Sequence, residues 1–315
     1  MSIVGPTGPA GPQGERGKNG RMGADGPTGP AGSGGGSIIN NTNVIGATGT
    51  FTNVGTEQNT LLGANLTVTG TSVVAIGYGA TTNQSLCTAV GINCSASGTN
   101  STAIGNNCQA LGDYSTAIGR NCLTSANSSY SICIGQDTQI YDGGAVCVGP
   151  NSKAQGNSSV SIGFYSYATG TNSISIGKDS RGYGDNVICI GNTSKSQAES
   201  AISIGNLAAA TGTNAIAIGL SASATGTSSI AIGGSAKANG ANSVAIGPSS
   251  VSSVANQIVL GSATSTVTSA GNIILPNKTV LPTSPAIGTI FCDTSATPAL
   301  LKFWDGAVWK TIATV

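Results

Sequence analysis

The hydrophobic pattern of this chain repeats every fourteen residues from residue 73 onward. In each repeat an Ile, Val or Leu stands directly before a glycine, and a β-branched residue usually stands two positions earlier. These marker glycines are at positions 77, 91, 105, 119, 135, 149, 163, 177, 191, 205, 219, 233, 247 and 261, and one interval, from Gly119 to Gly135, is sixteen residues long. A second glycine often follows seven residues later, as at Gly212 and Gly226. Two glycine corners leave two short strands per repeat, which predicts a parallel β-solenoid with fourteen-residue coils.

Alternation along the first strand predicts which side chains enter the coil. The large residues one and three positions before the marker glycine share a face, and we expect them to fill the coil interior against small residues three and five positions after it. The other face carries Ala, Ser or Cys two positions before the glycine in thirteen of fourteen repeats. We expect this small face to lie on the threefold axis of a trimer. The fourth position after the glycine should face solvent, since it is occupied by Gln109, Gln139, Lys153, Arg181, Lys195 and Lys237.

The first 32 residues carry an unrelated period of three. Glycine occupies every third position from Gly5 to Gly32, and five prolines lie between these glycines. Only glycine fits at the axis of three supercoiled polyproline II chains, so this period predicts a collagen triple helix and therefore three chains. The Gly/Ser-rich run from Gly32 to Ser37 is typical of a flexible joint. We expect a collagen-like stalk and joint at residues 1–36.

Two further segments flank the repeats. Residues 37–72 alternate Thr and Val between glycines and predict a β-rich adaptor that caps the first coil of a β-roll at residues 73–262. Residues 263–315 predict a C-terminal β-meander tip, with a strong hairpin signal at Asp305-Gly306. The adaptor is similar to shaft segments of bacteriophage tail fibres, and the tip resembles the terminal β-meander of many phage and large-virus fibre proteins.

The fourteen-residue unit itself resembles a known family. Asn214-Ala215-Ile216-Ala217-Ile218-Gly219, followed by Ala222-Ser223-Ala224-Thr225-Gly226, resembles the YadA-type head repeat of trimeric adhesins. The resemblance implies a left-handed parallel β-roll, three copies of which pack around one axis. The expected fold is therefore all-β: a trimeric left-handed parallel β-roll with an N-terminal collagen triple helix and a C-terminal β-meander.

Composition narrows the functional classes. The 315 residues include 48 Gly, no His and 7% charged residues, with a net charge of +1. Without His, the commonest general base and metal ligand is missing. A near-neutral chain lacks the basic footprint of a nucleic-acid-binding protein, and no stretch approaches the ~20 apolar residues of a membrane helix. We expect no enzyme, no cofactor, no metal, no nucleic-acid partner and no membrane insertion.

Cysteines and paired carboxylates are the candidates for chemistry. Six of the eight cysteines occupy two registers, three after the marker glycine on the inward side and two before it on the expected axial face: Cys94, Cys108 and Cys122, then Cys133, Cys147 and Cys189. Ala or Ser is the usual occupant of both registers, so these cysteines are interpreted as small apolar fillers. Asp185 and Glu199 share one register in adjacent coils and are the plausible pair for glycan hydrolysis. No insertion builds a cleft around them, so we favour single exposed acids.

Aromatic residues are the candidates for ligand contact. The predicted receptor or glycan contacts are Tyr141, Tyr165, Tyr167, Tyr183, Trp304 and Trp309. The four tyrosines would form a sugar-stacking patch in neighbouring coils, and scattered surface tyrosines are the alternative. The two tryptophans either pack the tip or contact a receptor.

These patterns predict a homotrimeric structural fibre that mediates attachment to a host surface. Met1-Ser2-Ile3-Val4 leads directly into the collagen-like repeat without a signal-peptide pattern, which favours assembly in a cytoplasm and a phage or large-virus fibre on the virion surface. The expected partners are two further copies of the chain, a host cell-surface glycan or protein receptor, and a virion or filament base protein at the N-terminus. The alternatives are a spore-surface or bacterial trimeric adhesin filament and, last, a polysaccharide-degrading tailspike.

Overall fold

The structure is a computed structural model, and it describes residues 43–45, 48–51, 58–266, 277–278, 288–293 and 300–312. The chain divides into two compact units, residues 1–265 and 266–315. The predicted collagen-like stalk at residues 1–36 lies outside the described residues, so it stays a prediction.

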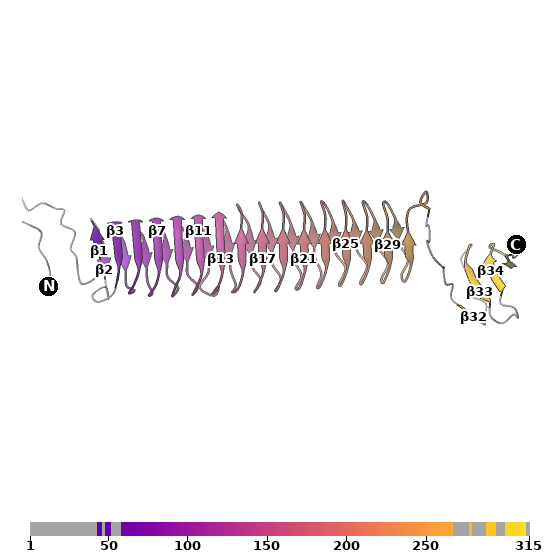
Figure 1. The fold of residues 1–315 in the computed structure, drawn as a ribbon, viewed down its shortest axis with the longest axis horizontal. Coiled ribbons are helices and arrows are strands. Elements are labelled where there is room, and N and C mark those ends of the chain that lie inside the picture. The colour runs from indigo at the N-terminus through magenta and orange to yellow at the C-terminus, as the bar shows by residue number, and fades with distance from the viewer. Residues whose placement is uncertain are drawn as a thin grey trace, which may run out of the picture. The chain divides into compact units, whose positions relative to one another are not determined.

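The first unit is a parallel β-solenoid in which each coil contributes one strand to each of two sheets (Figure 1). The odd-numbered sheet has sixteen strands in chain order: β1 (Asn43–Ile45), β3 (Thr60–Ala64), β5 (Val74–Tyr78), β7 (Thr88–Ile92), β9 (Thr102–Asn106), β11 (Thr116–Arg120), β13 (Ile132–Gln136), β15 (Val146–Val148), β17 (Val160–Ile162), β19 (Ile174–Ile176), β21 (Ile188–Ile190), β23 (Ile202–Ile204), β25 (Ile216–Ile218), β27 (Ile230–Ile232), β29 (Val244–Ile246) and β31 (Ile258–Leu260).

The even-numbered sheet has fifteen strands, also in chain order and parallel. They are β2 (Gly49–Phe51), β4 (Leu66–Val68), β6 (Thr81–Thr82), β8 (Ser95–Ala96), β10 (Gln109–Ala110), β12 (Leu123–Thr124), β14 (Gln139–Ile140), β16 (Lys153–Ala154), β18 (Tyr167–Ala168), β20 (Arg181–Gly182), β22 (Lys195–Ser196), β24 (Ala209–Ala210), β26 (Ser223–Ala224), β28 (Lys237–Ala238) and β30 (Val251–Ser252). The predicted all-β parallel solenoid with fourteen-residue coils is confirmed.

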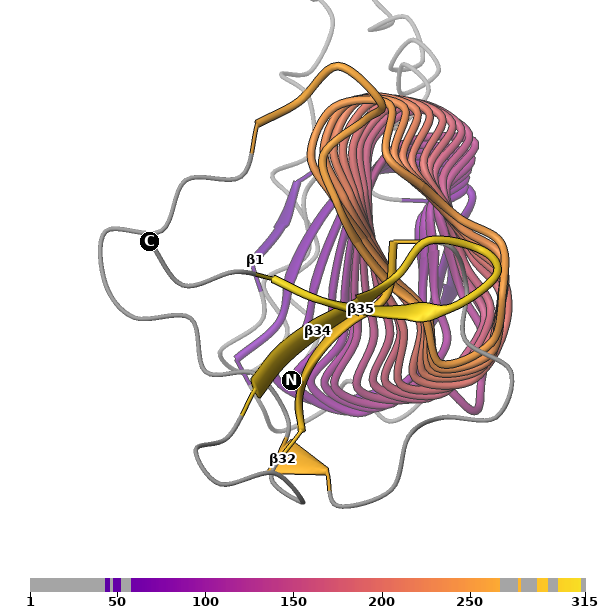
Figure 2. The ribbon, with the colours of Figure 1, turned by 90° about the vertical axis from the view of Figure 1, so that its right-hand side faces the viewer.

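Adjacent coils stack in strict register. Ile216 pairs with Ile230, fourteen residues later, and the same offset recurs along most of the roll, so the coils superpose when viewed along its length (Figure 2). In the sixteen-residue coil Thr116 pairs with Ile132 and Leu123 pairs with Gln139. The two extra residues therefore lie in the corner between β12 and β13, and the ladders on either side continue unbroken.

Small side chains fill the coil interior, which corrects the expected assignment of the two faces. Ala217, two positions before Gly219, is fully buried, and so are the small residues three and five positions after the marker glycines up to Gly247, such as Ala222. Ile216 and Ile218 point the other way and are only half-buried. Two opposed short strands in a fourteen-residue coil leave an interior that holds little more than Ala, Ser, Cys or Thr, so the pleat turns the branched residues outward.

Each coil also turns through left-handed backbone at two residues other than the glycine. Asn214 and Ser221, at φ of 56° and 53°, are examples of positions nine and two after the marker glycine. Asn, Asp and Ser tolerate this conformation because their short polar side chains bond locally. Most of these corner residues are therefore Asn or Ser, whereas Asp137 and Asp179 place a charge at two of the corners.

The residues predicted to form an adaptor contain β1 to β4. Strand β3 pairs with β5 in the register of the repeat, with Gly63 opposite Gly77. The described part of residues 37–72 thus continues the two sheets of the roll toward the N-terminus.

The second unit contains β32 (Asn277–Lys278), β33 (Ile290–Asp293), β34 (Leu300–Trp304) and β35 (Trp309–Thr311). Strands β33, β34 and β35 are antiparallel neighbours, so the hairpin predicted at Asp305-Gly306 is confirmed. The Asp305 carboxylate accepts hydrogen bonds from the backbone N–H groups of Ala307 and Val308, at 2.9 and 2.8 Å. It also pairs with Lys310 at 2.8 Å, and this cation, with the backbone donors, holds the pKa of Asp305 well below its usual value.

Candidate ligand-binding face

The outer face of the even-numbered sheet carries the long polar side chains of the roll. Ser152 and Ala154 are buried in the coil, whereas Lys153 and Gln155, four and six positions after Gly149, face outward. The prediction that the fourth position faces solvent is confirmed. Positions four and six together therefore form the accessible surface of this sheet.

Three of the four predicted tyrosines lie on this face. Tyr141 and Tyr183 occupy the sixth position and are 41% and 42% exposed, and Tyr167 occupies the fourth position and is partly exposed. The Tyr141 hydroxyl donates a 2.7 Å hydrogen bond to Oε1 of Gln139. Tyr165 is placed differently. It occupies a left-handed corner at φ of 53° and packs edge-on against Phe164, with ring centroids 4.4 Å apart.

Cations and an aromatic ring line up across four neighbouring strands of the same face. Lys153 is the register partner of Tyr167, Tyr167 of Arg181, and Arg181 of Lys195. We call these four residues the basic ladder. Nζ of Lys153 lies 5.9 Å from the centroid of the Tyr167 ring, within the range of a cation–π contact.

The cations of the basic ladder have no acidic partner within the described residues. The ion pairs there are Arg120–Asp137 and Lys310–Asp305, and neither includes Lys153, Arg181 or Lys195. Asp179 stands at the corner two residues before Arg181, outside ion-pair distance of the three cations. The ladder therefore presents uncompensated positive charge on a nearly neutral chain.

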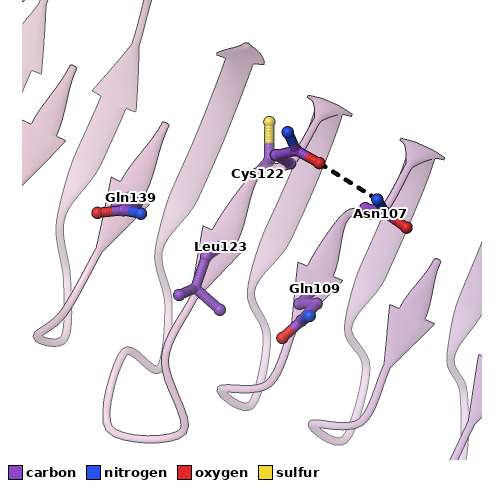
Figure 3. A pocket seen from close by; sticks show the side chains of 6 residues that line it. Asn107, Gln109, Cys122, Leu123 and Gln139 are labelled. Carbon is purple, nitrogen blue, oxygen red and sulfur yellow. Dashed lines mark hydrogen bonds between the residues drawn. The ribbon is translucent and has the colours of Figure 1, made fainter. Parts of the chain in front are cut away.

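An open hollow of about 290 Å³ (Figure 3) lies on the same face, on the strands that precede the ladder. It is lined by Asn107, Gln109, Asn121, Cys122, Leu123 and Gln139. Gln109, Leu123 and Gln139 come from β10, β12 and β14, in the register of the basic ladder, and Gln139 pairs directly with Lys153. The hollow and the ladder are therefore one continuous surface.

A chain of side-chain amides orders the edge of the hollow. Asn107 Nδ2 donates to Oδ1 of Asn121 at 3.4 Å, the dashed contact of Figure 3, and Asn121 Nδ2 donates to Oδ1 of Asp137 at 2.7 Å. The Asn121 amide, with further help from Gln136 and the Arg120 guanidinium, lowers the pKa of Asp137. The carboxylate thus anchors the amides, whose remaining donors and acceptors suit hydroxyl groups of a ligand.

The roll cysteines are buried free thiols. Those within the described roll are Cys87, Cys94, Cys108, Cys122, Cys133, Cys147 and Cys189. The register two before the glycine proves to be interior, so the expected axial placement of Cys133, Cys147 and Cys189 was wrong for the reason given above. Burial raises the pKa of Cys147 to about 12, with the hydrogen bond to Ser152 partly opposing it. The described residues contain no group of three or more Cys, Asp or Glu that could hold a metal ion.

One of the two paired carboxylates, Asp185, forms a hydrogen bond between coils. Oδ1 of Asp185 accepts a 2.8 Å hydrogen bond from the backbone N–H of Thr171 in the preceding coil. Neither Asp185 nor Glu199 lines the hollow of Figure 3. Asp185 therefore joins two coils at a corner rather than facing a reacting group.

The predicted tryptophan contacts belong to the second unit. Trp304 and Trp309 are direct cross-strand partners, and their ring centroids lie 5.4 Å apart. Both are partly buried, so each ring covers part of the other. This contact supports packing of the hairpin while leaving part of each ring accessible.

The YadA head domain repeat family matches residues 88–121, 144–166, 154–180, 168–194, 196–222 and 224–250. Over these residues the roll is similar to the YadA head repeat. The YadA head is a structural adhesin fold and not an enzyme family, as the sequence analysis expected. No helix in the described part of the chain is long and apolar enough to cross a membrane.

The collagen-binding domain of the Yersinia adhesin YadA is 23% identical to this chain, with 58% of this chain and 77% of that chain covered and a TM-score of 0.29. No curated protein matches the chain.

Sequence reasoning separated residues that the structure brings together. It placed Lys153, Arg181 and Lys195 on the solvent face and the tyrosines in a patch, without joining the two sets. Their shared registers, four and six after the marker glycine, were the available signal. The amide edge at Asn107 and Asn121 was missed because corner asparagines recur throughout the roll.

Proposed function

We propose that three copies of this chain assemble into an adhesive fibre whose rod is the YadA-like roll. An exposed apolar stripe on the odd-numbered sheet carries this proposal. It runs along successive strands and includes Ile132, Ile134, Ile162, Ile204, Ile232, Ile246 and Ile258, which are between 36% and 68% exposed. Contiguous apolar surface of this length is rare on a monomeric protein and marks an interaction surface.

The stripe fits a threefold assembly of rolls. Each roll presents one apolar sheet face and one polar sheet face, so three rolls bury the apolar faces together and keep the polar faces in water. The collagen-like triplets of residues 1–36 independently require three chains. The residues at the proposed axis are the branched ones, in place of the small residues expected from the sequence.

The fibre is proposed to act at an exposed surface, as adhesin domains do. We further propose that the fibre belongs to a virion and that its N-terminal segment attaches to a base protein. The resemblance of the strands around Trp304 and Trp309 to viral fibre tips supports this assignment. A bacterial or spore-surface adhesin is the alternative, and collagen, named for the Yersinia domain, is then a candidate receptor.

Mass measurement of the full chain in solution tests the assembly. We expect about 92 kDa, three times the 30.6 kDa of one chain, by sedimentation or native mass spectrometry. A stable monomer at micromolar concentration would contradict the fibre. Gold-labelled antibody against the C-terminal unit, imaged on purified particles and on cells, distinguishes a virion fibre from a cell-surface adhesin.

A further inference from the structure

We propose that the basic ladder and the adjoining hollow bind an acidic polysaccharide that lies along the length of the roll. The proposal deepens the proposed function by naming a ligand class, and it rests on the trimer in so far as assembly leaves the even-numbered sheet exposed. The surface runs from Gln109 on β10 to Lys195 on β22.

The charge pattern favours a linear polyanion. Adjacent strands are about 4.8 Å apart, so Arg181 and Lys195 are separated by one strand spacing and Lys153 and Arg181 by about twice that distance. A polymer crossing the strands with regularly spaced carboxylates or sulfates meets these cations in succession. No carboxylate of the described residues neutralises them, so binding breaks no existing ion pair.

The uncharged side chains of the surface favour sugar over nucleic acid. Tyr167 and Tyr183 offer partly exposed rings whose apolar faces can cover sugar rings, and the amides of Asn107 and Gln109 can bond hydroxyl groups. Nucleic-acid affinity comes mainly from neutralising many phosphates with Lys and Arg. A surface with three cations on a chain of net charge +1 provides too few for that mode.

The surface also stays open in the proposed fibre. Residues four and six after the marker glycine lie on the even-numbered sheet, whereas the apolar stripe lies on the odd-numbered sheet across the coil interior. Burying the stripe at the threefold axis therefore leaves Tyr183 and the ladder facing solvent. Three equivalent surfaces would give the fibre multivalent attachment.

Binding of the full chain to immobilised dextran sulfate and polygalacturonate, with neutral dextran as reference, tests the proposal. The first variant is Arg181→Ser/Lys195→Ser, because Ser95 and Ser223 already occupy this register. We expect it to weaken binding about tenfold at low salt, since each exposed ion pair contributes a factor of about two to five. The matched pair is Lys195→Ser and Lys237→Ser, which remove the same side chain from the same register inside and outside the ladder. We expect Lys237→Ser to change binding less than about twofold.

A second variant tests the sugar contact separately from charge. Tyr183→Thr places in the sixth position the residue that Thr169 and Thr211 already provide. We expect it to weaken polysaccharide binding about threefold, because an exposed aromatic contact is worth a modest fraction of the total. Unchanged binding by Tyr183→Thr, equal losses in Lys195→Ser and Lys237→Ser, or tighter binding to single-stranded DNA than to either polysaccharide would overturn the proposal.

The mass of each variant keeps the two proposals distinguishable. A trimer that binds neither polysaccharide contradicts this inference and leaves the fibre intact. A monomer that binds them contradicts the fibre and leaves the ladder as the binding surface.

Discussion

Gly219 and Gly233 stack so closely in adjacent coils that a Cβ on Gly219 would lie 2.6 Å from the carbonyl oxygen of Gly233. Gly219 also has φ of +131°, a conformation that residues with a side chain rarely adopt. The same close approach recurs along the marker glycines, so their period reflects backbone contact between coils as well as the turn within each coil.

Gly219→Ala should therefore destabilise the roll. Strain at this φ and the clash with the next coil together are expected to lower the free energy of unfolding by about 3 kcal/mol. Urea unfolding followed by circular dichroism, with limited proteolysis of the central coils, measures the loss. The control is Gly234→Ala, where nothing lies within 4 Å of an added Cβ. Equal destabilisation by both substitutions would show that coil contact at Gly219 is unimportant.

The glycine period predicts coil length, parallel pairing and corner positions because each depends on local geometry. It does not determine which face of a strand turns inward. Ala217 and Ile218 alternate whichever face is buried, and the width of the closed coil, a tertiary property, decides between them. The same limit applies to the candidate site. The register of Tyr183 and Arg181 is readable from the sequence, whereas the corner position of Tyr165 depends on a left-handed turn that the alternation does not reveal.

Ser229→Ala should stabilise the roll. The Ser229 hydroxyl is buried without a hydrogen-bond partner, and Ala215 occupies the same register one coil earlier. Removing a buried unpaired hydroxyl should raise the free energy of unfolding by about 1 kcal/mol. The control is Ser166→Ala, since the Ser166 hydroxyl donates to the Ser175 carbonyl at 2.9 Å and should cost about that amount when removed. Thermal unfolding of the two variants should move in opposite directions, and shifts of the same sign would refute the assignment.

Charge placed on the apolar stripe should dissociate the proposed trimer. Ile232→Lys/Ile246→Lys puts two cations on neighbouring strands of the odd-numbered sheet, where three copies would bring six charges together at the axis. We expect sedimentation to show monomer while circular dichroism keeps its β signal, because both side chains point out of the coil. Val251→Lys adds a charge to the outer face of the even-numbered sheet, where Lys237 already stands at the same register, and should leave the trimer intact. A trimer that survives the double substitution would place the interface elsewhere.

The buried thiol of Cys147 should make the stability of the roll fall in alkaline solution. Its pKa is raised from 9.0 to about 12, chiefly because burial penalises the thiolate. A raised pKa means that the stabilising contribution is complete below pH 9, where the thiol is protonated in folded and unfolded chains alike. Above pH 9 the thiol of the unfolded chain ionises first. The free energy of unfolding therefore falls by about 1.4 kcal/mol per pH unit as the pH rises toward 12.

Cys147→Ala isolates this contribution, since Ala103 and Ala117 occupy the same register and Ser152 keeps its 2.8 Å hydrogen bond to the Gly149 carbonyl. Every other ionisable group is common to the two proteins, so its contribution cancels in the comparison. Urea unfolding at pH 8 and pH 10.5 with reductant present should show wild type losing about 2 kcal/mol more than the variant across this interval. Parallel pH dependence of the two proteins would mean that the Cys147 thiol ionises as freely in the folded roll as in the unfolded chain.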